Sequence, residues 1–488
     1  MFARLVLAML VLSGCDARGC HSRGSDSRGS DSFARSSARD DVSEESMRGA
    51  PASVRSGPPD VLVVTIDTAR ADRFGAYGYA TARTPVFDAL AARGVRYLHA
   101  TTPTPLTVPA HVTLFTGLHP AVHGSEVNAP PPTPLAGHTR PQLLAEEFRA
   151  FGYRTAAFVA SGILAPRFGL SDGFATYDAP PIGVRELPAT DRVERALAWV
   201  DTPSGLPLDA PFFLWLHFME AHSPHIDPAT AAIGPGAYDG ELAAVDDALG
   251  VLLAGLRARG RAERLVVIVV GDHGEGFGDH GEVEHGVLLY EETMRVPLVI
   301  SAPRDFIGGR VVDRAVTLAD LAPTLRESCG LAAVESDGVS LRGEPGARDV
   351  VDQSRYSELM LGWAPLRALR RGTLVYIDAP RPELYDLAAD PGERDNLLSV
   401  RPDDARSMAS ALIAARAALL ARRRTTEQPG AIDEARARLT ALGYATQTSA
   451  ASSALADPKD MIADYEARRT ARGVGRPPTW SAPTSSGP

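Results

Sequence analysis

The sequence predicts an α/β fold with a mostly parallel central sheet flanked by helices, followed by a smaller C-terminal α+β subdomain. Two observations carry this prediction. Short continuous runs of apolar, often β-branched residues, such as "DVLVVTID" (60–67) and "RLVVIVV" (264–270), are typical of strands buried on both faces. Segments with helical start and stop signals alternate with these runs, which favours parallel strands joined by helices.

The helix expected at 84–94 shows its boundaries most clearly. Thr84 is its predicted N-cap, Pro85 opens its first turn, and Gly94 follows its last residue. The other helices are expected at 141–151, 190–201, 236–258, 317–327 and 405–424, and the other strands at 155–160, 212–218 and 296–301.

Composition supports a globular protein and excludes one class of partner. The chain has 488 residues, of which 44% are hydrophobic, and a formal net charge of -10. This length predicts two domains, or one large domain with a smaller appendage. The acidic balance without a basic patch argues against nucleic acid as a partner. We expect a catalytic domain at 58–348, a C-terminal subdomain at 349–445 and a poorly ordered tail, rich in Ala, Ser and Pro, at 446–488.

The N-terminus has the pattern of an export signal. Arg4 precedes a short apolar run, too short to span a membrane, that ends in Leu-Ser-Gly-Cys15. This end resembles the lipobox of bacterial lipoproteins, which implies cleavage before Cys15 and a lipid on its thiol. The alternative is an ordinary signal peptide followed by a chance cysteine. Residues 1–15 are thus the predicted leader and 16–57 a disordered tether. We expect a protein of the cell envelope, anchored to a membrane by lipid and facing the periplasm or exterior.

Charged and metal-binding side chains lie where predicted strands end. Asp67 ends the first strand, His217 lies near the end of strand 212–218, and Asp272 and His273 directly follow strand 264–270. Ligand sites in parallel sheets lie beyond the carboxyl ends of the strands. An adjacent Asp and His form a compact pair of metal ligands. These residues are therefore expected to converge on one metal site.

Histidines are unevenly distributed. Nine of the 12 lie in the three short segments 111–123, 217–225 and 273–285. Single histidines are usually satisfied core or surface residues, which is our interpretation of His119, His123 and His225. The acidic residues of helix 236–258 are likewise interpreted as structural, and Glu275 as a residue that orients a ligand.

Thr107 has two interpretations. It stands two residues before Pro109 in "TPTPLTVPAHVTLFTG" (102–117), at or just before the start of a short helix that should end at Gly117. Considered alone, this stretch favours a plain N-cap threonine. The second interpretation is an activated nucleophile.

Five ordered motifs bear on this choice. The chain resembles the sulfatase family, within the alkaline phosphatase superfamily, over roughly residues 58–400. The motifs are "DVLVVTIDTARADRFGAYGY", "TVPAHVTLFTGLHP", "FFLWLHFMEAHSPH", "VVGDHGEGFGDHGEVEHGVLLYEETMRVPLVI" and "ELYDLAADPGERDNL". The resemblance implies an alkaline phosphatase/sulfatase-like fold, with Asp67, Asp272, His273 and Thr107 as metal ligands and Thr107 as the nucleophile.

The resemblance also implies catalytic roles for four histidines. His111 lies where the family often has an Arg that supports the nucleophile. His217 or His222 matches the region of the histidine that binds substrate or protonates the leaving group. His285 falls where many sulfatases carry a Lys that contacts the sulfate.

Three residues depart from the family pattern, and they bear on which activity the resemblance implies. Thr107 stands where sulfatases place a Cys or Ser that becomes formylglycine, Thr68 where they usually have a second Asp, and His273 where they commonly have Asn. A Thr nucleophile with these ligands is more similar to phosphotransferases and phosphodiesterases of the superfamily. The resemblance implies Ca²⁺ as the one divalent metal ion, whereas the His273 ligand favours Zn²⁺ or Mn²⁺.

The sequence thus predicts a metal-dependent hydrolase of sulfate or phosphate esters that acts through Thr107. Its substrate would be a sulfated or phosphorylated small molecule, glycan or lipid head group. Two alternatives stay open: a phosphoryl-group transferase of the cell envelope, and a non-catalytic binding protein with the same fold.

Overall fold

The computed structural model describes most of the chain beyond residue 56. The described residues are 57–134, 140–181, 188–203, 205–226, 235–302, 306, 308–344, 346–423, 425–426, 430, 433–434, 437 and 455–471. The predicted leader and most of the tether lie outside them.

An eight-stranded, mostly parallel sheet forms the centre of the fold, as predicted. Its strands, in spatial order, are β5 (Thr176–Asp178), β4 (Arg154–Phe158), β6 (Phe212–Phe218), β1 (Asp60–Ile66), β7 (Leu265–Gly271), β8 (Leu298–Ser301), β2 (Val95–Thr101) and β9 (Arg310–Thr317). Only β8 runs antiparallel to its neighbours, β7 and β2. The first strand predicted, β1, pairs in parallel with both β6 and β7.

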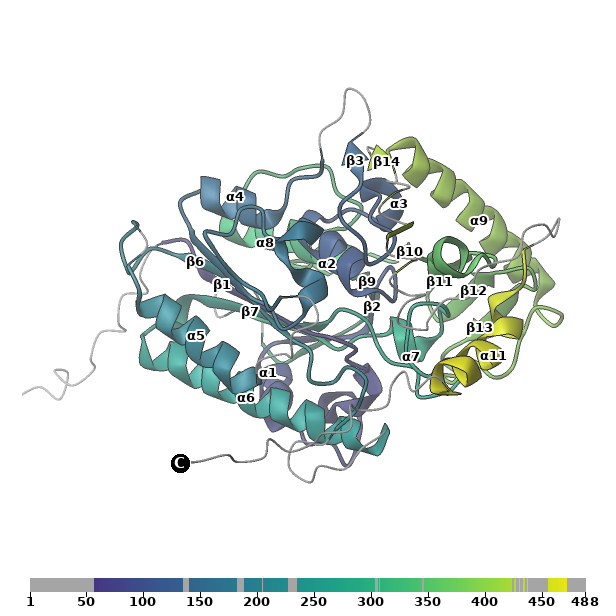
Figure 1. Cartoon of the computed structure of the whole chain (residues 1–488), viewed down its shortest axis with the longest axis horizontal. Coiled ribbons are helices and arrows are strands. Elements are labelled where there is room, and N and C mark those ends of the chain that lie inside the picture. Colours follow the sequence, from purple (N-terminus) through teal and green to yellow (C-terminus); the bar gives the residue numbers. More distant parts are fainter. Residues whose placement is uncertain are drawn as a thin grey trace, which may run out of the picture. The chain divides into compact units, whose positions relative to one another are not determined.

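Helices cover both faces of this sheet (Figure 1). One face carries α1 (Pro85–Arg93), α5 (Ala189–Asp201) and α6 (Tyr238–Ala258); the other carries α2 (Thr107–Thr116), α4 (Leu144–Ala150) and α8 (Leu321–Cys329). Along β1, Val61 and Val63 belong to one core, and Leu62 and Val64 to the other. Burial on both faces therefore explains why the strand sequence is continuously apolar rather than alternating.

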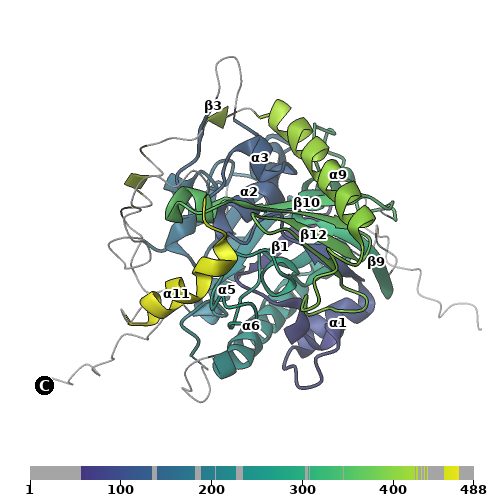
Figure 2. The same cartoon turned by 90° about the vertical axis from the view of Figure 1, so that its right-hand side faces the viewer.

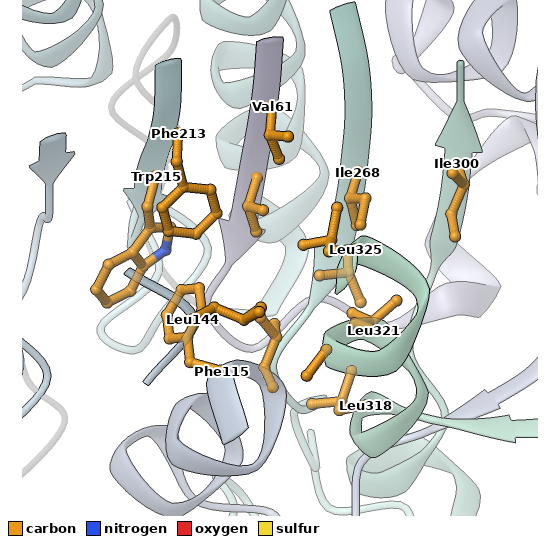
Figure 3. Close-up of a cluster of buried hydrophobic side chains, with 14 of the residues drawn as sticks. Val61, Phe115, Leu144, Phe213, Trp215, Ile268, Ile300, Leu318, Leu321 and Leu325 are labelled. Atoms are coloured by element: carbon orange, nitrogen blue, oxygen red, sulfur yellow. The ribbon is translucent and has the colours of Figure 1, made fainter. Parts of the chain in front are cut away.

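The core under α2, α4 and α8 is rich in aromatic rings. Figure 3 shows Phe213 and Trp215 of β6 facing Phe115 of α2 and Leu144 of α4. The ring of Phe148 in α4 stacks on Phe213, with centroids 4.5 Å apart. This packing fixes α2, and with it the start of that helix, against the sheet.

The expected helices all form, although several ends are displaced: α4 and α8 begin later than residues 141 and 317, and the helix expected at 405–424 spans 402–421. Thr84 and Gly94 flank α1 as expected, although the amides of Val86 and Phe87 are capped by the Asp246 carboxylate of α6, at 2.8 Å each. Gly117 ends α2 with φ of 79°, a conformation that glycine adopts freely. The interpretation of Thr107 as an N-cap, however, is wrong.

Helix α2 begins two residues before the proline that was expected to open it. Leu106 is the N-cap, in extended conformation, and its own side chain makes no capping hydrogen bond. Thr107 is thus the first helical residue and Pro109 the third. Proline is tolerated anywhere in the first turn, since its missing N–H has no partner within the helix there.

A four-stranded antiparallel sheet forms the C-terminal subdomain (Figure 2). Its strands are β10 (Asp349–Ser354), β11 (Leu366–Arg371), β12 (Leu374–Asp378) and β13 (Glu383–Asp386), and α9 (Pro402–Ala421) packs on it through Met408 and Leu412. The remaining short elements are α3 (Pro120–His123), α7 (Glu291–Met294) and the pair β3 (Thr133–Pro134) and β14 (Thr425–Thr426).

The prediction of a poorly ordered tail is wrong for one segment. Residues Pro458–Ala471 form α11, and Ile462 on this helix is buried in a core shared with the loop before α7. Among the described residues, no helix combines the length and apolar character that crossing a bilayer requires.

Replacing Phe148 by Ala should lower the free energy of unfolding by about 3–5 kcal/mol, because it opens a cavity beside Phe213. Phe151, three residues further along, is 53% exposed, so Phe151→Ala serves as the matched control with a change within about 0.5 kcal/mol. Urea denaturation followed by circular dichroism measures both. Equal losses for the two variants would contradict this account of the core.

Candidate active site

The ends of strands β1 and β7 converge as the sequence predicts. Asp67 follows β1, and Asp272 and His273 follow β7; all three side chains are fully buried. His273 Nε2 lies 3.6 Å from Asp67 Oδ1 and 3.6 Å from Asp272 Oδ2. One ligand atom from each residue lies within 4.8 Å of the others. The three residues therefore form a compact cluster of one nitrogen and two carboxylate donors.

The two carboxylates are electrostatically incompatible without a cation. Burial, followed by the negative charge of Asp67, raises the pKa of Asp272 well above its ordinary value. Burial opposes ionisation of Asp67 as well, but His217, His222 and His273 lower the pKa of this carboxyl overall. Two buried carboxylates this close favour a shared proton or a bound cation.

A threonine in a strained conformation connects the strand ends. Thr68 has φ of 53°, which is unusual for a β-branched residue. Its hydroxyl donates to the carbonyl of Ala221, which follows β6, at 2.7 Å, and its amide donates to Asp272 Oδ1 at 3.2 Å. Thr68 therefore links the ends of β1, β6 and β7 and helps to orient the Asp272 carboxylate.

The Thr107 side chain faces this cluster from the first turn of α2. Its Oγ1 lies 3.2 Å from His273 Nε2, and the residue is fully buried. The next amide, of Val108, donates to Asn128 Oδ1 at 2.9 Å. Asn128 therefore caps the first turn of α2 through its side-chain oxygen. Sequence reasoning missed Asn128, which lies in no recognisable pattern.

His111 lies beneath Thr107 as a neutral residue. Its Nδ1 donates to the carbonyl of Thr107 at 2.7 Å, and its Nε2 lies 3.0 Å from the Thr65 hydroxyl, which accepts from Trp215 at 2.9 Å. Burial, followed by the neighbouring His217, lowers the pKa of His111 to about 3. His111 therefore holds the backbone of Thr107 without adding positive charge.

The two candidates for a leaving-group histidine lie in different places. His217 is fully buried within β6, with its Nε2 3.3 Å from Asp67 Oδ2. His222 is half-buried, and its Nε2 lies 3.3 Å from Nε2 of His285. Of the two imidazoles, only that of His222 is accessible to a substrate.

His285 completes the site. Its Nδ1 donates to the carbonyl of Pro105 at 3.1 Å, and its ring lies over His273, with centroids 4.1 Å apart. Burial, followed by His273 and His222, lowers the pKa of His285 well below its ordinary value. The structure thus brings together every residue that the sequence singled out for the site.

The residues interpreted as structural have structural contacts. His119 accepts from the amide of Ala121, His123 contacts the Thr113 hydroxyl at 3.0 Å, and His225 contacts Glu241 at 2.9 Å. His225 also lies 3.7 Å from Glu275, which is fully buried.

The donor set fits a divalent cation. Both carboxylate oxygens of Asp67 and Oδ2 of Asp272 are buried and have no hydrogen-bond partner among the described residues. Burial, opposed in part by Asp67, lowers the pKa of His273 to about 4, so its imidazole is neutral and able to bind a metal near pH 7.

Comparisons with known proteins agree with this geometry. The sulfatase family matches residues 59–331. The Δ4,5-hexuronate-2-O-sulfatase of Bacteroides thetaiotaomicron is 24% identical over 405 residues, which cover 70% of this chain and 84% of that protein. Among solved structures, a phosphonate monoester hydrolase of Agrobacterium radiobacter has a TM-score of 0.61 and 23% identity, covering 74% of this chain and 96% of its own. A 2-O GAG sulfatase has a TM-score of 0.60 and 22% identity, covering 77% and 96%.

The fold and the cluster at its strand ends define a hydrolase of the alkaline phosphatase/sulfatase type. This chain belongs to the sulfatase family, whose members acting on sulfate esters include the Bacteroides relative. The predicted family and fold are thereby confirmed.

Asp67→Asn and Asp272→Asn should each weaken binding of a divalent cation by about 100-fold or more, since each removes an anionic ligand. Isothermal titration with Zn²⁺, Mn²⁺ and Ca²⁺ measures the loss. Asp247→Asn, at an exposed position on α6, is the control and should bind as the unmodified protein does. Unchanged affinity in both site variants would show that the cation, if bound, lies elsewhere.

Proposed function

We propose that this chain is a metal-dependent ester hydrolase in which Thr107 is the nucleophile. One observation carries the proposal: Thr107 Oγ1 is 3.2 Å from His273 Nε2, beside the Asp67, Asp272 and His273 cluster. The cation that these residues would hold supplies a Lewis acid, which lowers the pKa of the Thr107 hydroxyl.

The chain's own residues account for the remaining chemistry. Thr107 Oγ1 gives up its proton to solvent and attacks the phosphorus or sulfur atom in line, forming a Thr–O–P or Thr–O–S bond as the bond to the leaving oxygen breaks. His111 holds the Thr107 carbonyl, which fixes the first turn of α2. Water then attacks the same centre, and Thr107 Oγ1 leaves and regains a proton.

The His222 and His285 pair is suited to protonating the leaving oxygen. Both Nδ1 atoms contact carbonyls, of Ser223 and Pro105, and therefore carry hydrogens. Their Nε2 lone pairs then face each other at 3.3 Å, an arrangement that favours one additional proton between them. An anionic ester at this position would stabilise that proton, and His222 would donate it to the leaving group.

Charge balance favours a monoanionic ester. The two carboxylates neutralise a divalent cation, and the histidines that occupy the family's Arg and Lys positions, His111 and His285, have lowered pKa values. A dianionic phosphate monoester would therefore meet less positive charge here than in a site with fixed cations. Phosphate diesters, phosphonate monoesters and sulfate esters each carry a single negative charge.

Among these, phosphorus esters fit Thr107 better. The ester formed on a threonine must be released by direct attack of water, since threonine lacks the geminal hydroxyl through which formylglycine hydrate expels sulfate. The likeness to a phosphonate monoester hydrolase is consistent with this choice but shows the fold alone. Sulfated sugars, on which relatives act, are the second substrate class. The His273 ligand favours Zn²⁺ or Mn²⁺ over Ca²⁺.

Thr107→Ala should reduce turnover roughly 10³-fold or more, as expected for loss of a nucleophile. Turnover of an aryl phosphate diester, an aryl phosphonate, an aryl phosphate and an aryl sulfate is compared with each metal. Thr116→Ala, in the same helix and bonded to the Val112 carbonyl, is the control. An active Thr107→Ala variant would rule out this nucleophile.

The same assay separates the alternatives. Faster release of the aryl group when an alcohol is added, with transfer to that alcohol, would indicate a transferase. Metal binding without turnover of any of the four esters would favour a binding protein. Sulfate turnover that depends on Thr107 would identify a sulfatase that needs no formylglycine.

We also propose that the chain is anchored in the cell envelope by a lipid on Cys15. The support is the lipobox-like Leu-Ser-Gly-Cys15 end of the leader and the polar repeat that follows it. Cys15→Ala should abolish incorporation of labelled fatty acid and release the protein from membranes. Cys20→Ala is the matched control, and equal labelling of both variants would contradict the proposal.

A further inference from the structure

We infer that the C-terminal helix α11 is part of the catalytic apparatus, with Arg469 acting as a positioning residue for His285. This inference rests on the proposed function for the role of His285 and adds a determinant far outside the family motifs. The helix lies about 180 residues after the loop that it contacts, and no motif marks it in the sequence.

The loop before α7 carries His285 at the end of a hairpin. The amides of Gly276, Phe277 and Gly278 donate to the carbonyls of Glu284, Val283 and Glu282, at 2.7, 3.1 and 2.8 Å. His285 therefore follows directly on the last residue of this hairpin, and its position depends on how the hairpin is held.

One side of the hairpin is fixed by the catalytic domain itself. Arg70 donates to Asp279 at 2.6 Å and to the carbonyl of Glu275 at 3.1 Å. The buried Glu282 carboxylate accepts from the amides of Val287 and Leu288, at 2.8 Å each. These contacts hold the tip and the exit of the hairpin, and the Pro105 carbonyl holds the His285 ring, but none of them contacts Val283 or Glu284, which lead into His285.

Helix α11 supports these two residues. The Arg469 guanidinium pairs with the Glu284 carboxylate, next to His285, and with Glu466 at 3.0 Å. Glu466 in turn accepts from the amide of Val283 at 3.3 Å. Arg469 and Glu466 are only 5% and 6% exposed, so these charged contacts are shielded from competing water. Figure 1 shows α11, in yellow, beside the teal segment that leads into α7.

The helix is itself docked by contacts that the hairpin does not supply. The Ala456 carbonyl accepts from the amide of Ala364 at 2.8 Å, and Asp457 accepts from the amide of Arg381 at 3.0 Å. Tyr465 packs edge-to-face on Trp363, with centroids 5.7 Å apart. Because α11 is anchored on the C-terminal subdomain, it can transmit a fixed position to the hairpin rather than merely follow it.

The test uses the whole chain with three changes on α11. Arg469→Ala should increase hydrogen exchange at the Val283 amide and across 281–285 by about tenfold or more, and lower kcat/KM by about tenfold. Arg469→Lys retains a charge and should recover part of both effects. Arg468→Ala is the matched control, since Arg468 is 57% exposed and pairs with Asp464 on the same helix.

A double-variant comparison assigns the effect to His285. In a His285→Ala background, adding Arg469→Ala should change kcat/KM by less than about twofold, because the positioned group is absent. Full additivity of the two changes would overturn the inference, as would exchange across 281–285 that is the same in Arg469→Ala and Arg468→Ala. The exchange measurement does not depend on turnover, so it decides the role of Arg469 even if every tested ester fails and the proposed function falls.

Discussion

The burial of two carboxylates at the ends of adjacent parallel strands is the constraint on which the site depends. Asp67 and Asp272 follow β1 and β7, which pair in register along their whole length, so the two charges cannot move apart without breaking the central sheet. The surrounding residues make contacts that offset the repulsion between these two carboxylates. Thr68 adopts a left-handed conformation to bring its amide to Asp272, His217 contacts Asp67, and a divalent cation would neutralise both carboxylates.

Two other imidazoles of the site, those of His111 and His273, are neutral near pH 7. Burial lowers the pKa values of His111 and His273 to about 3 and about 4, so neither competes with a cation for the carboxylates. Each imidazole instead makes a directional contact, since His111 holds the backbone of the nucleophile and His273 offers a lone pair beside Thr107. Because neither imidazole adds positive charge, the proposed reactivity of Thr107 would depend on a bound cation and on the substrate's own charge.

The sequence predicted the features of the fold and site that depend on residues close together in the chain, and missed those that depend on contacts between distant residues. Continuous apolar strands, Asp67 and the adjacent Asp272 and His273 are local signals, and the rule that sites lie at the carboxyl ends of parallel strands brought them together.

Asn128 and Thr65 were missed because their roles are set by contacts across the fold, to Val108 and His111. The N-cap interpretation of Thr107 failed because helix boundaries inferred from proline are uncertain by one or two residues. The tail was misjudged because α11 is held by tertiary contacts to the C-terminal subdomain rather than by a strong amphipathic pattern.

The C-terminal subdomain therefore connects fold and chemistry. Its sheet shares a core with the loop before α7: Leu366, Ala368 and Val375 pack with Leu288 and Met294. The same loop carries His285, whose Nε2 meets His222 from the opposite side of the site. One half of this acid pair thus belongs to the loop after β6, which is fixed by the central sheet, and the other half to a hairpin braced by α11. The 3.3 Å separation of these nitrogens would then depend on both supports, so in this chain the proposed acid pair would rely on C-terminal residues outside the region that the sulfatase family matches.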